Sequence, residues 1–90
     1  MKKDWNVRAV QEIIAEFAGR EYFEIRENDT LHSLSRYKGS LFSDDFIEFL
    51  LKKKLEIESE YDVELVDEKK LRNFVDVYRT THDFMLGLAL

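Results

Sequence analysis

The residues best placed to do chemistry are a serine and two aspartates in a row, Ser43, Asp44 and Asp45. This order is typical of a helix start, because a serine hydroxyl accepts an unpaired backbone N–H and carboxylates are stabilised at the positive end of the helix dipole. A serine between a long loop and a helix exposes its hydroxyl, and the same N–H groups and dipole favour a phosphate. Ser43 is therefore either the attachment point of a phosphate-containing group or only a helix cap.

Other reactive constellations are missing from the sequence. The chain has no cysteine, which excludes a thiolate zinc site and a thiol nucleophile. The two histidines, His32 and His82, are far apart, so any metal site would need carboxylates from elsewhere in the chain. Acidic residues alternate with apolar ones over residues 56–64, but this stretch lacks the glycine and the Asp/Asn spacing of a calcium loop. The three glycines are isolated, and no Ser, His and Asp form a recognised motif. We therefore expect no metal site and no enzyme activity.

Length and charge narrow the class of protein further. The chain has 90 residues, 14 basic and 19 acidic side chains and a net charge of −5, which indicates one soluble acidic domain spanning residues 1–90. Acidity argues against nucleic-acid binding and favours partners with basic surfaces. Apolar runs are too short for a membrane span or a signal peptide. With no cysteine to indicate an oxidising compartment, we expect a cytoplasmic location. We also expect the protein to be a monomer.

Two segments precede the serine. Apolar side chains at Val10, Ile14 and Phe17 share one helical face, which predicts a helix over residues 4–18. Asp4 is a candidate cap for its start, and Gly19 stands where a helix commonly ends. Residues 20–42 lose the helical period and are rich in turn-forming side chains, which predicts a long loop anchored by a few apolar residues.

The segment that follows Ser43 has two interpretations. Helical spacing of Phe46, Ile47 and Leu50 predicts a second helix that extends to about residue 60. Residues 55–65, however, alternate almost strictly between apolar and acidic, which is the period of a half-buried strand. A strand there would need a partner, for which residues 22–26 are the only clear candidate. We favour the helix, and an α+β domain that pairs these two segments is the alternative.

Two shorter helices complete the prediction. Asp67 can cap a helix over residues 68–74, and Asp76 can cap a last helix in which Val77, Phe84 and Leu88 share a face. The expected fold class is therefore all-α, a four-helix bundle of three main helices and one short helix, with a long loop between the first two helices. The expected core contains Val10, Ile14, Phe17, Phe46, Ile47, Leu50, Phe74, Val77 and Phe84.

The sequence around the serine resembles a known signature. Residues 39–50 are similar to the segment of acyl carrier proteins and their peptidyl and D-alanyl relatives in which a glycine, an apolar pair and an Asp-Ser-Leu triplet open the second helix. Laid over that pattern without gaps, Ser43 falls on the modified serine of the family, and residues 47–49 fall on its apolar-Glu-apolar run. Phe42 stands where the family has the aspartate of the triplet, and Asp44 where it has the leucine.

Weaker similarities extend over nearly the whole chain. Residues 10–17 resemble the first helix of the family, residues 29–34 its Asp-x-x-Leu loop segment, and residues 61–65 its Phe-Asp/Gly-Ile-Glu-Ile run. The resemblance implies the acyl-carrier four-helix bundle. It also implies that Ser43 carries covalent 4'-phosphopantetheine, whose thiol holds an acyl or aminoacyl group as a thioester for delivery to partner enzymes.

The same resemblance implies partners and a surface for them. A phosphopantetheinyl transferase would modify Ser43, and acyl- or aminoacyl-transferring enzymes would then dock around Asp44, Asp45, Phe46 and Glu48. A basic partner surface would be opposed by the three lysines at residues 52–54. The alternative is an interaction module with a carrier-like fold that has lost the arm, in which Ser43 is only part of a helix start.

Overall fold

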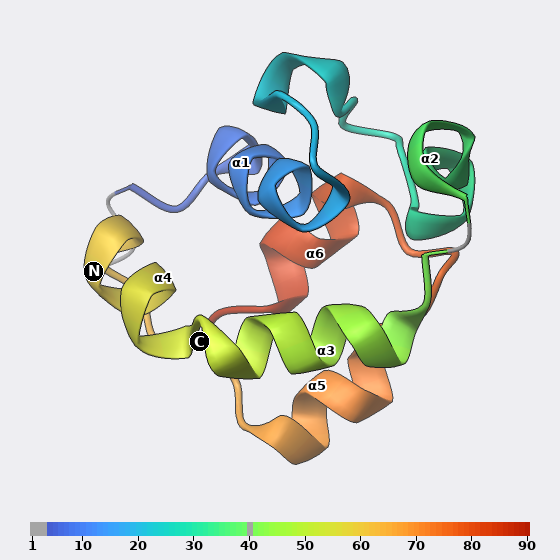
Figure 1. Cartoon of the computed structure of the whole chain (residues 1–90). Coiled ribbons are helices and arrows are strands. Elements are labelled where there is room, and N and C mark those ends of the chain that lie inside the picture. Colours follow the sequence, from blue (N-terminus) through green and yellow to red (C-terminus); the bar gives the residue numbers. More distant parts are fainter. Residues whose placement is uncertain (1–3, 40) are drawn as a thin grey trace.

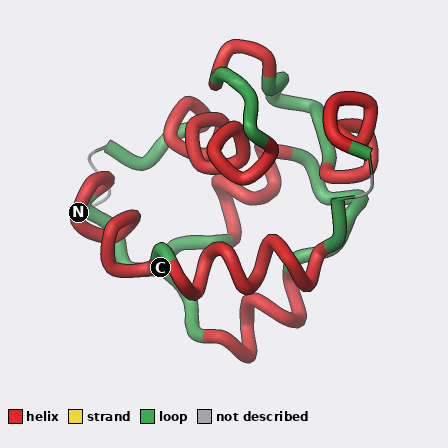
Figure 2. The backbone as a smooth tube through the Cα atoms, in the orientation of Figure 1, coloured by secondary structure: helices red, strands yellow, loops and turns green. Residues whose placement is uncertain are grey.

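The computed structural model describes residues 4–39 and 41–90, which form six α-helices and one short 3-10 helix (Figure 1). Loops connect these helices (Figure 2). β-structure within the described ranges is limited to two isolated bridges, Thr30 with Thr80 and Leu65 with Ala89. In chain order the elements are α1 (Val7–Ala18), η1 (Tyr22–Glu24), α2 (Leu31–Lys38), α3 (Ser43–Lys52), α4 (Lys54–Tyr61), α5 (Glu68–Phe74) and α6 (Thr81–Gly87).

The chain is all-α, but the expected four-helix bundle is wrong, because two predicted segments are divided differently. The expected loop over residues 20–42 contains η1 and the complete helix α2. The helix expected over residues 43–60 is broken at Lys53, whose φ of −98° and ψ of 8° lie outside the α-helical range. In Figure 1, α4 turns away from the axis of α3 after this residue.

The choice between helix and strand after residue 54 is decided in favour of helix. Residues 54–61 form α4, and Ile57 and Tyr61, four positions apart, are its buried side chains. Leu55 is 80% exposed, so the apolar residues of the alternating pattern do not share one buried face. The alternative α+β domain is therefore wrong, and Tyr22–Glu24, part of its second proposed strand, forms η1.

Local chemistry at single residues sets the ends of α1 and the start of α5. Gly19 ends α1 with a φ of 72°, a left-handed conformation that glycine adopts without a Cβ penalty. Asp67 caps α5, accepting the Lys70 N–H at 2.8 Å. Both predictions are confirmed, whereas Asn6 rather than Asp4 caps α1.

The start of the last helix differs from the prediction. Thr80 caps α6, and the Thr80 hydroxyl and Asp83 carboxylate each accept the other residue's N–H. Asp76, the expected cap, instead accepts the N–H groups of Tyr78 and Arg79 in the preceding turn. Helix α6 therefore begins four residues later than Asp76 as its cap would require.

The core is larger than the predicted set because the extra helix and the chain ends contribute to it. Helix α1 packs against α6 and η1, and α3 packs against α5. Of the predicted core residues, six are buried and three, Phe17, Phe74 and Val77, are partly buried against the core. Side chains that the prediction left out include Trp5, Ala9, Ile13, Ile25, Leu31, Leu34, Leu71 and Leu88. No helix in the described ranges is long and apolar enough to cross a membrane.

Candidate functional site

Ser43 is the first residue of α3 and not its cap. Phe42 holds the cap position and offers no side-chain hydrogen bond to the helix. The first α-helical bond at this end joins the Phe46 N–H to the Phe42 carbonyl oxygen at 3.1 Å, which leaves the amides of Ser43, Asp44 and Asp45 outside the helical ladder. The Ser43 side chain is half-buried, and no described residue forms a hydrogen bond with its hydroxyl. The hydroxyl and three amides are thus available at the positive end of the helix dipole.

The acidic residues near Ser43 differ in their surroundings. Asp44, Asp45 and Glu48 are all exposed, but Nη2 of Arg72, on α5, lies 3.7 Å from Oε1 of Glu48. The pKa of Arg72 is raised by its hydrogen bond with Glu68 and by the charges of Glu68, Glu48 and Asp44. No described cation pairs with Asp45, which is therefore the carboxylate of this group most available to another molecule.

Phe46 does not belong to the exposed rim of the site. Its side chain is fully buried, with ring centroids 5.1 Å from Phe17 and 5.4 Å from Phe84. It anchors α3 to α1 and α6, so a partner has no access to the ring in this conformation. The exposed aromatic side chain at this end of α3 is Phe42, with 58% of its surface accessible.

A cavity of about 300 Å³ opens immediately before α3. Its walls are His32 and Ser35 of α2, Leu41 and Phe42 of the segment that leads to α3, and Val77. Tyr78, 70% exposed, adds its ring to this region, with the centroid 5.3 Å from that of His32. These residues could not be identified from the sequence, because no spacing in the chain connects residue 32 with residue 77.

A buried aspartate holds α2 in position beside this cavity. The Asp29 carboxylate accepts hydrogen bonds from the Arg26 N–H, the Ser33 hydroxyl and both terminal nitrogens of Arg36, at 2.8 to 3.2 Å. Burial alone raises the pKa of Asp29, but the hydrogen bonds from Arg36, Arg26 and Ser33 outweigh it, so the pKa lies below its usual value. Asp29 therefore remains charged at neutral pH and fixes the start of α2.

Main-chain bonds connect α2 to the segment before α6. The His32 N–H donates to the Val77 carbonyl oxygen at 2.9 Å, and the Thr81 N–H donates to the Asp29 carbonyl oxygen at 2.8 Å. In Figure 1, α2 lies beside the loop that leads into α6. These bonds bring Val77 to the cavity in which His32 and Ser35 lie.

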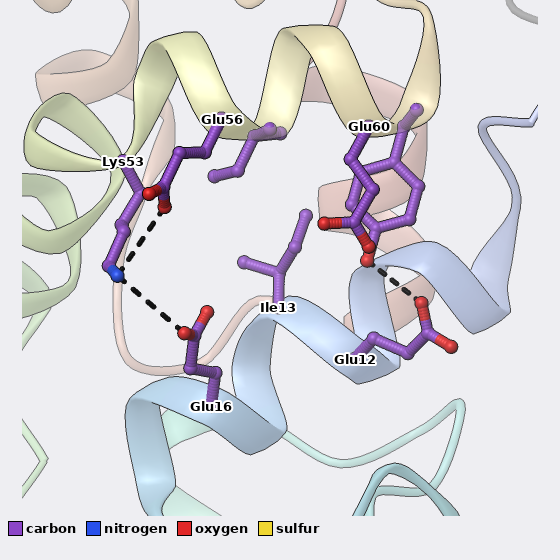
Figure 3. A pocket seen from close by; sticks show the side chains of 8 residues that line it. Glu12, Ile13, Glu16, Lys53, Glu56 and Glu60 are labelled. Atoms are coloured by element: carbon purple, nitrogen blue, oxygen red, sulfur yellow. Dashed lines mark hydrogen bonds and ion pairs between the residues drawn. The ribbon is translucent and has the colours of Figure 1, made fainter.

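A second cavity, of about 350 Å³, lies between α1 and α4 (Figure 3). Nζ of Lys53 lies between two carboxylates, 3.7 Å from Oε1 of Glu16 and 3.4 Å from Oε2 of Glu56. The Tyr61 hydroxyl donates to Oε1 of Glu12 at 2.8 Å. Burial, and then the hydrogen bond to Glu12, raise the pKa of Tyr61, so the phenol stays protonated at neutral pH.

This cavity is too far from Ser43 for its side chains to contact the serine. Lys53 comes after the last residue of α3 and Ser43 is the first, so about 15 Å of helix separates them. Much of the polar lining is paired internally, which joins α1 to α4. Among residues 4–39 and 41–90 no group of three or more His, Asp or Glu side chains is arranged to hold a metal ion.

The two histidines lie in different environments. His32 lines the cavity beside α3, whereas Nδ1 of His82 lies 2.8 Å from the Glu27 carboxylate.

Comparison of the chain with protein families, with curated proteins and with solved structures gives no match.

Proposed function

We propose that this protein is a non-catalytic carrier that holds acyl or aminoacyl groups as thioesters on 4'-phosphopantetheine attached to Ser43. The observation that carries the proposal is the half-exposed Ser43 hydroxyl, which has no hydrogen-bond partner among the described residues and stands at a helix start without a side-chain cap. The proposal rests on this geometry and on the sequence resemblance around Ser43, and it does not require a four-helix bundle.

The chemistry of attachment fits the local electrostatics. A transferase would join Oγ of Ser43 to the phosphorus of coenzyme A that bears the pantetheine and break the pyrophosphate bond. Adenosine 3',5'-bisphosphate would leave, and the hydroxyl proton would pass to a base. The new phosphodiester carries a negative charge, which the three free amides and the helix dipole stabilise. The carboxylates of Asp44 and Asp45 oppose this charge, but both are exposed, so water and salt screen the repulsion.

The cavity beside Ser43 provides a surface on which the arm can rest. It begins at Phe42, the residue directly before the serine, and combines apolar walls at Leu41 and Val77 with the polar groups of His32 and Ser35. The pantetheine arm contains amides as well as aliphatic carbons, so this mixed lining suits it. The exposed ring of Phe42 and the carboxylate of Asp45 are then the nearest contacts for a transferase or for an acyl-transferring enzyme in the cytoplasm.

A second candidate function, an interaction module without an arm, is favoured by one specific observation. Phe42 and Tyr78 are 58% and 70% exposed; Phe42 lines the cavity beside α3, and the ring of Tyr78 lies against that of His32, which also lines it. Phe42 also occupies the position of the aspartate in the family signature. In this alternative, the two aromatic rings contact a protein partner directly and Ser43 remains unmodified.

The experiment that separates the two functions is intact-mass analysis after incubation with coenzyme A and a promiscuous phosphopantetheinyl transferase. We expect the mass of one phosphopantetheinyl group to be added to the natural chain and not to Ser43→Ala. Ser40→Ala is the matched control for a neighbouring hydroxyl, although Ser40 lies outside the described residues. Absence of the added mass with several transferases would favour the interaction module, and its persistence in Ser43→Ala would move the site to another residue.

A further inference from the structure

A third cavity, of about 340 Å³, lies between α5 and α6 and has a different chemical character. Its lining is Val66, Lys70, Asn73, Phe74, Arg79 and Gly87. This set contains an aromatic ring, an aliphatic side chain, an amide and two cations, and it contains no carboxylate. The chain as a whole carries a net charge of −5, so the charge of this lining is opposite in sign to that of the whole chain.

Arg79 is held in one orientation at this cavity. Its Nε donates to the Phe74 carbonyl oxygen, and the guanidinium lies over the Phe74 ring at 4.1 Å from the centroid. The nearest acid, Asp76, is 4.0 Å from Nε and accepts the Tyr78 and Arg79 amides. The two terminal nitrogens of Arg79 have no hydrogen-bond partner among the described residues, so the fork that binds a carboxylate in two-point fashion is free.

The other residues that line the cavity indicate which kind of ligand would fit it. Gly87 has no side chain, and a Cβ at this position would overlap the ring of Phe74, so α6 approaches the ring closely. Lys70 is exposed and its ammonium group forms no ion pair with a described residue. The exposed amide of Asn73 is a further donor. The ammonium group of Lys70 and the two terminal nitrogens of Arg79, at the edge of an apolar hollow of this size, match a small molecule with an apolar body and one carboxylate.

We propose that the cavity between α5 and α6 is a binding site for small apolar carboxylates, with Arg79 and Lys70 binding the carboxylate and Phe74 and Val66 contacting the apolar body. This site is separate from the proposed modification of Ser43 and does not depend on it. The bound group makes only non-covalent contacts, so no reaction at this site is involved.

Three probes with one apolar body and different charges test the proposal: 3-phenylpropionate, 3-phenylpropanol and 3-phenylpropylamine. In a titration followed by amide and Arg Nε–H NMR signals, we expect 3-phenylpropionate to shift the signals of residues 73, 74, 79 and 87 saturably. The alcohol should bind at least about tenfold more weakly, and the amine more weakly still, because tenfold is about what one charge-assisted contact contributes. Equal binding of the acid and the alcohol would overturn the role of the cations.

Variants locate the carboxylate contact. Arg79→Gln and Lys70→Gln should each weaken 3-phenylpropionate binding, whereas Lys69→Gln, at an exposed neighbouring lysine of α5 outside the cavity, should not. Lys70→Gln removes no described contact, so the proposal stays testable even if Arg79→Gln disturbs the fold. An equal loss in Lys69→Gln would show only a general charge effect and overturn the assignment. Saturable binding of inorganic phosphate with the same shifts and equal affinity would overturn the requirement for an apolar body.

Discussion

Thr81 binds the main-chain carbonyl oxygen of Asp29 twice, through its N–H at 2.8 Å and through its hydroxyl at 3.1 Å, across 52 positions of sequence. The threonine is fully buried and the aspartate is 6% exposed, so neither bond competes with bulk water. Through this contact the start of α2 is fixed to the start of α6. The cavity beside Ser43 exists because α2 is held there and does not extend into solvent as a loop.

Burial of α2 predicts a large effect from shortening one of its side chains. Leu34→Ala should lower the free energy of unfolding by about 2–5 kcal/mol, because the side chain is fully buried and its removal leaves a cavity. Leu55→Ala, at a leucine that is 80% exposed on α4, is the matched control and should change the free energy of unfolding by no more than about 0.5 kcal/mol. Urea unfolding of both variants checks this, and similar midpoints for the two would mean that α2 does not pack on the core.

The turn between α2 and α3 predicts an order for two glycine substitutions. Gly39 has a φ of 75° and a ψ of −148°, close to a region that only glycine adopts, whereas Gly19 has left-handed helical angles of 72° and 34°. An added Cβ meets no atom within 4 Å at either position, so backbone strain alone determines the cost. Gly39→Ala should lower the free energy of unfolding by about 2–3 kcal/mol and Gly19→Ala by about 1 kcal/mol. The reverse order, measured by urea unfolding, would contradict the turn geometry.

The hydrogen bonds to Asp29 predict a loss of stability in acid. The pKa of Asp29 is lower in the folded chain than its usual value of about 3.9. Such a group contributes stability that is present above the unfolded pKa and is lost as pH falls through the folded pKa. Between about pH 5 and pH 2 the unfolding free energy of Asp29→Asn should therefore fall less steeply than that of the natural chain. Glu64→Gln, at an exposed acid, should keep the natural slope, and an unchanged slope in Asp29→Asn would remove this role from the aspartate.

The exposed Asp45 predicts how a modifying enzyme meets this surface. If a transferase approaches with a basic surface, Asp45→Lys should lower kcat/KM for modification of Ser43 by about three- to tenfold at low salt, because charges at an interface edge mainly change association rates. The difference should nearly vanish at about 1 M salt, where the screening length is about 3 Å. Glu64→Lys makes the same change in net charge at another exposed position. An equal decrease in that control would assign the effect to net charge and not to the end of α3.

Local signals in the sequence were sufficient where the interacting groups are neighbours in the chain. Gly19 and Asp67 were identified because a left-handed glycine and an aspartate cap act within a few residues of the helix end they define. The helical spacing of Phe46, Ile47 and Leu50 likewise predicted a buried face that the structure confirms. The reciprocal caps of Thr30 with Ser33 and of Thr80 with Asp83 are local too, and they are the signals that could have placed the starts of α2 and α6.

Tertiary structure alone decided the features that depend on distant partners. Helix α2 is short and its segment lacks a clear helical period, so its stability comes from burial of Leu31 and Leu34 and from bonds to residues 77 and 81. The break at Lys53 coincides with an ion pair to Glu16, 37 positions earlier, which no local pattern encodes. For the candidate site, the sequence determined that a serine opens α3. Only folding decided that His32 and Val77 form a cavity beside it, because the contacts that join them are non-local.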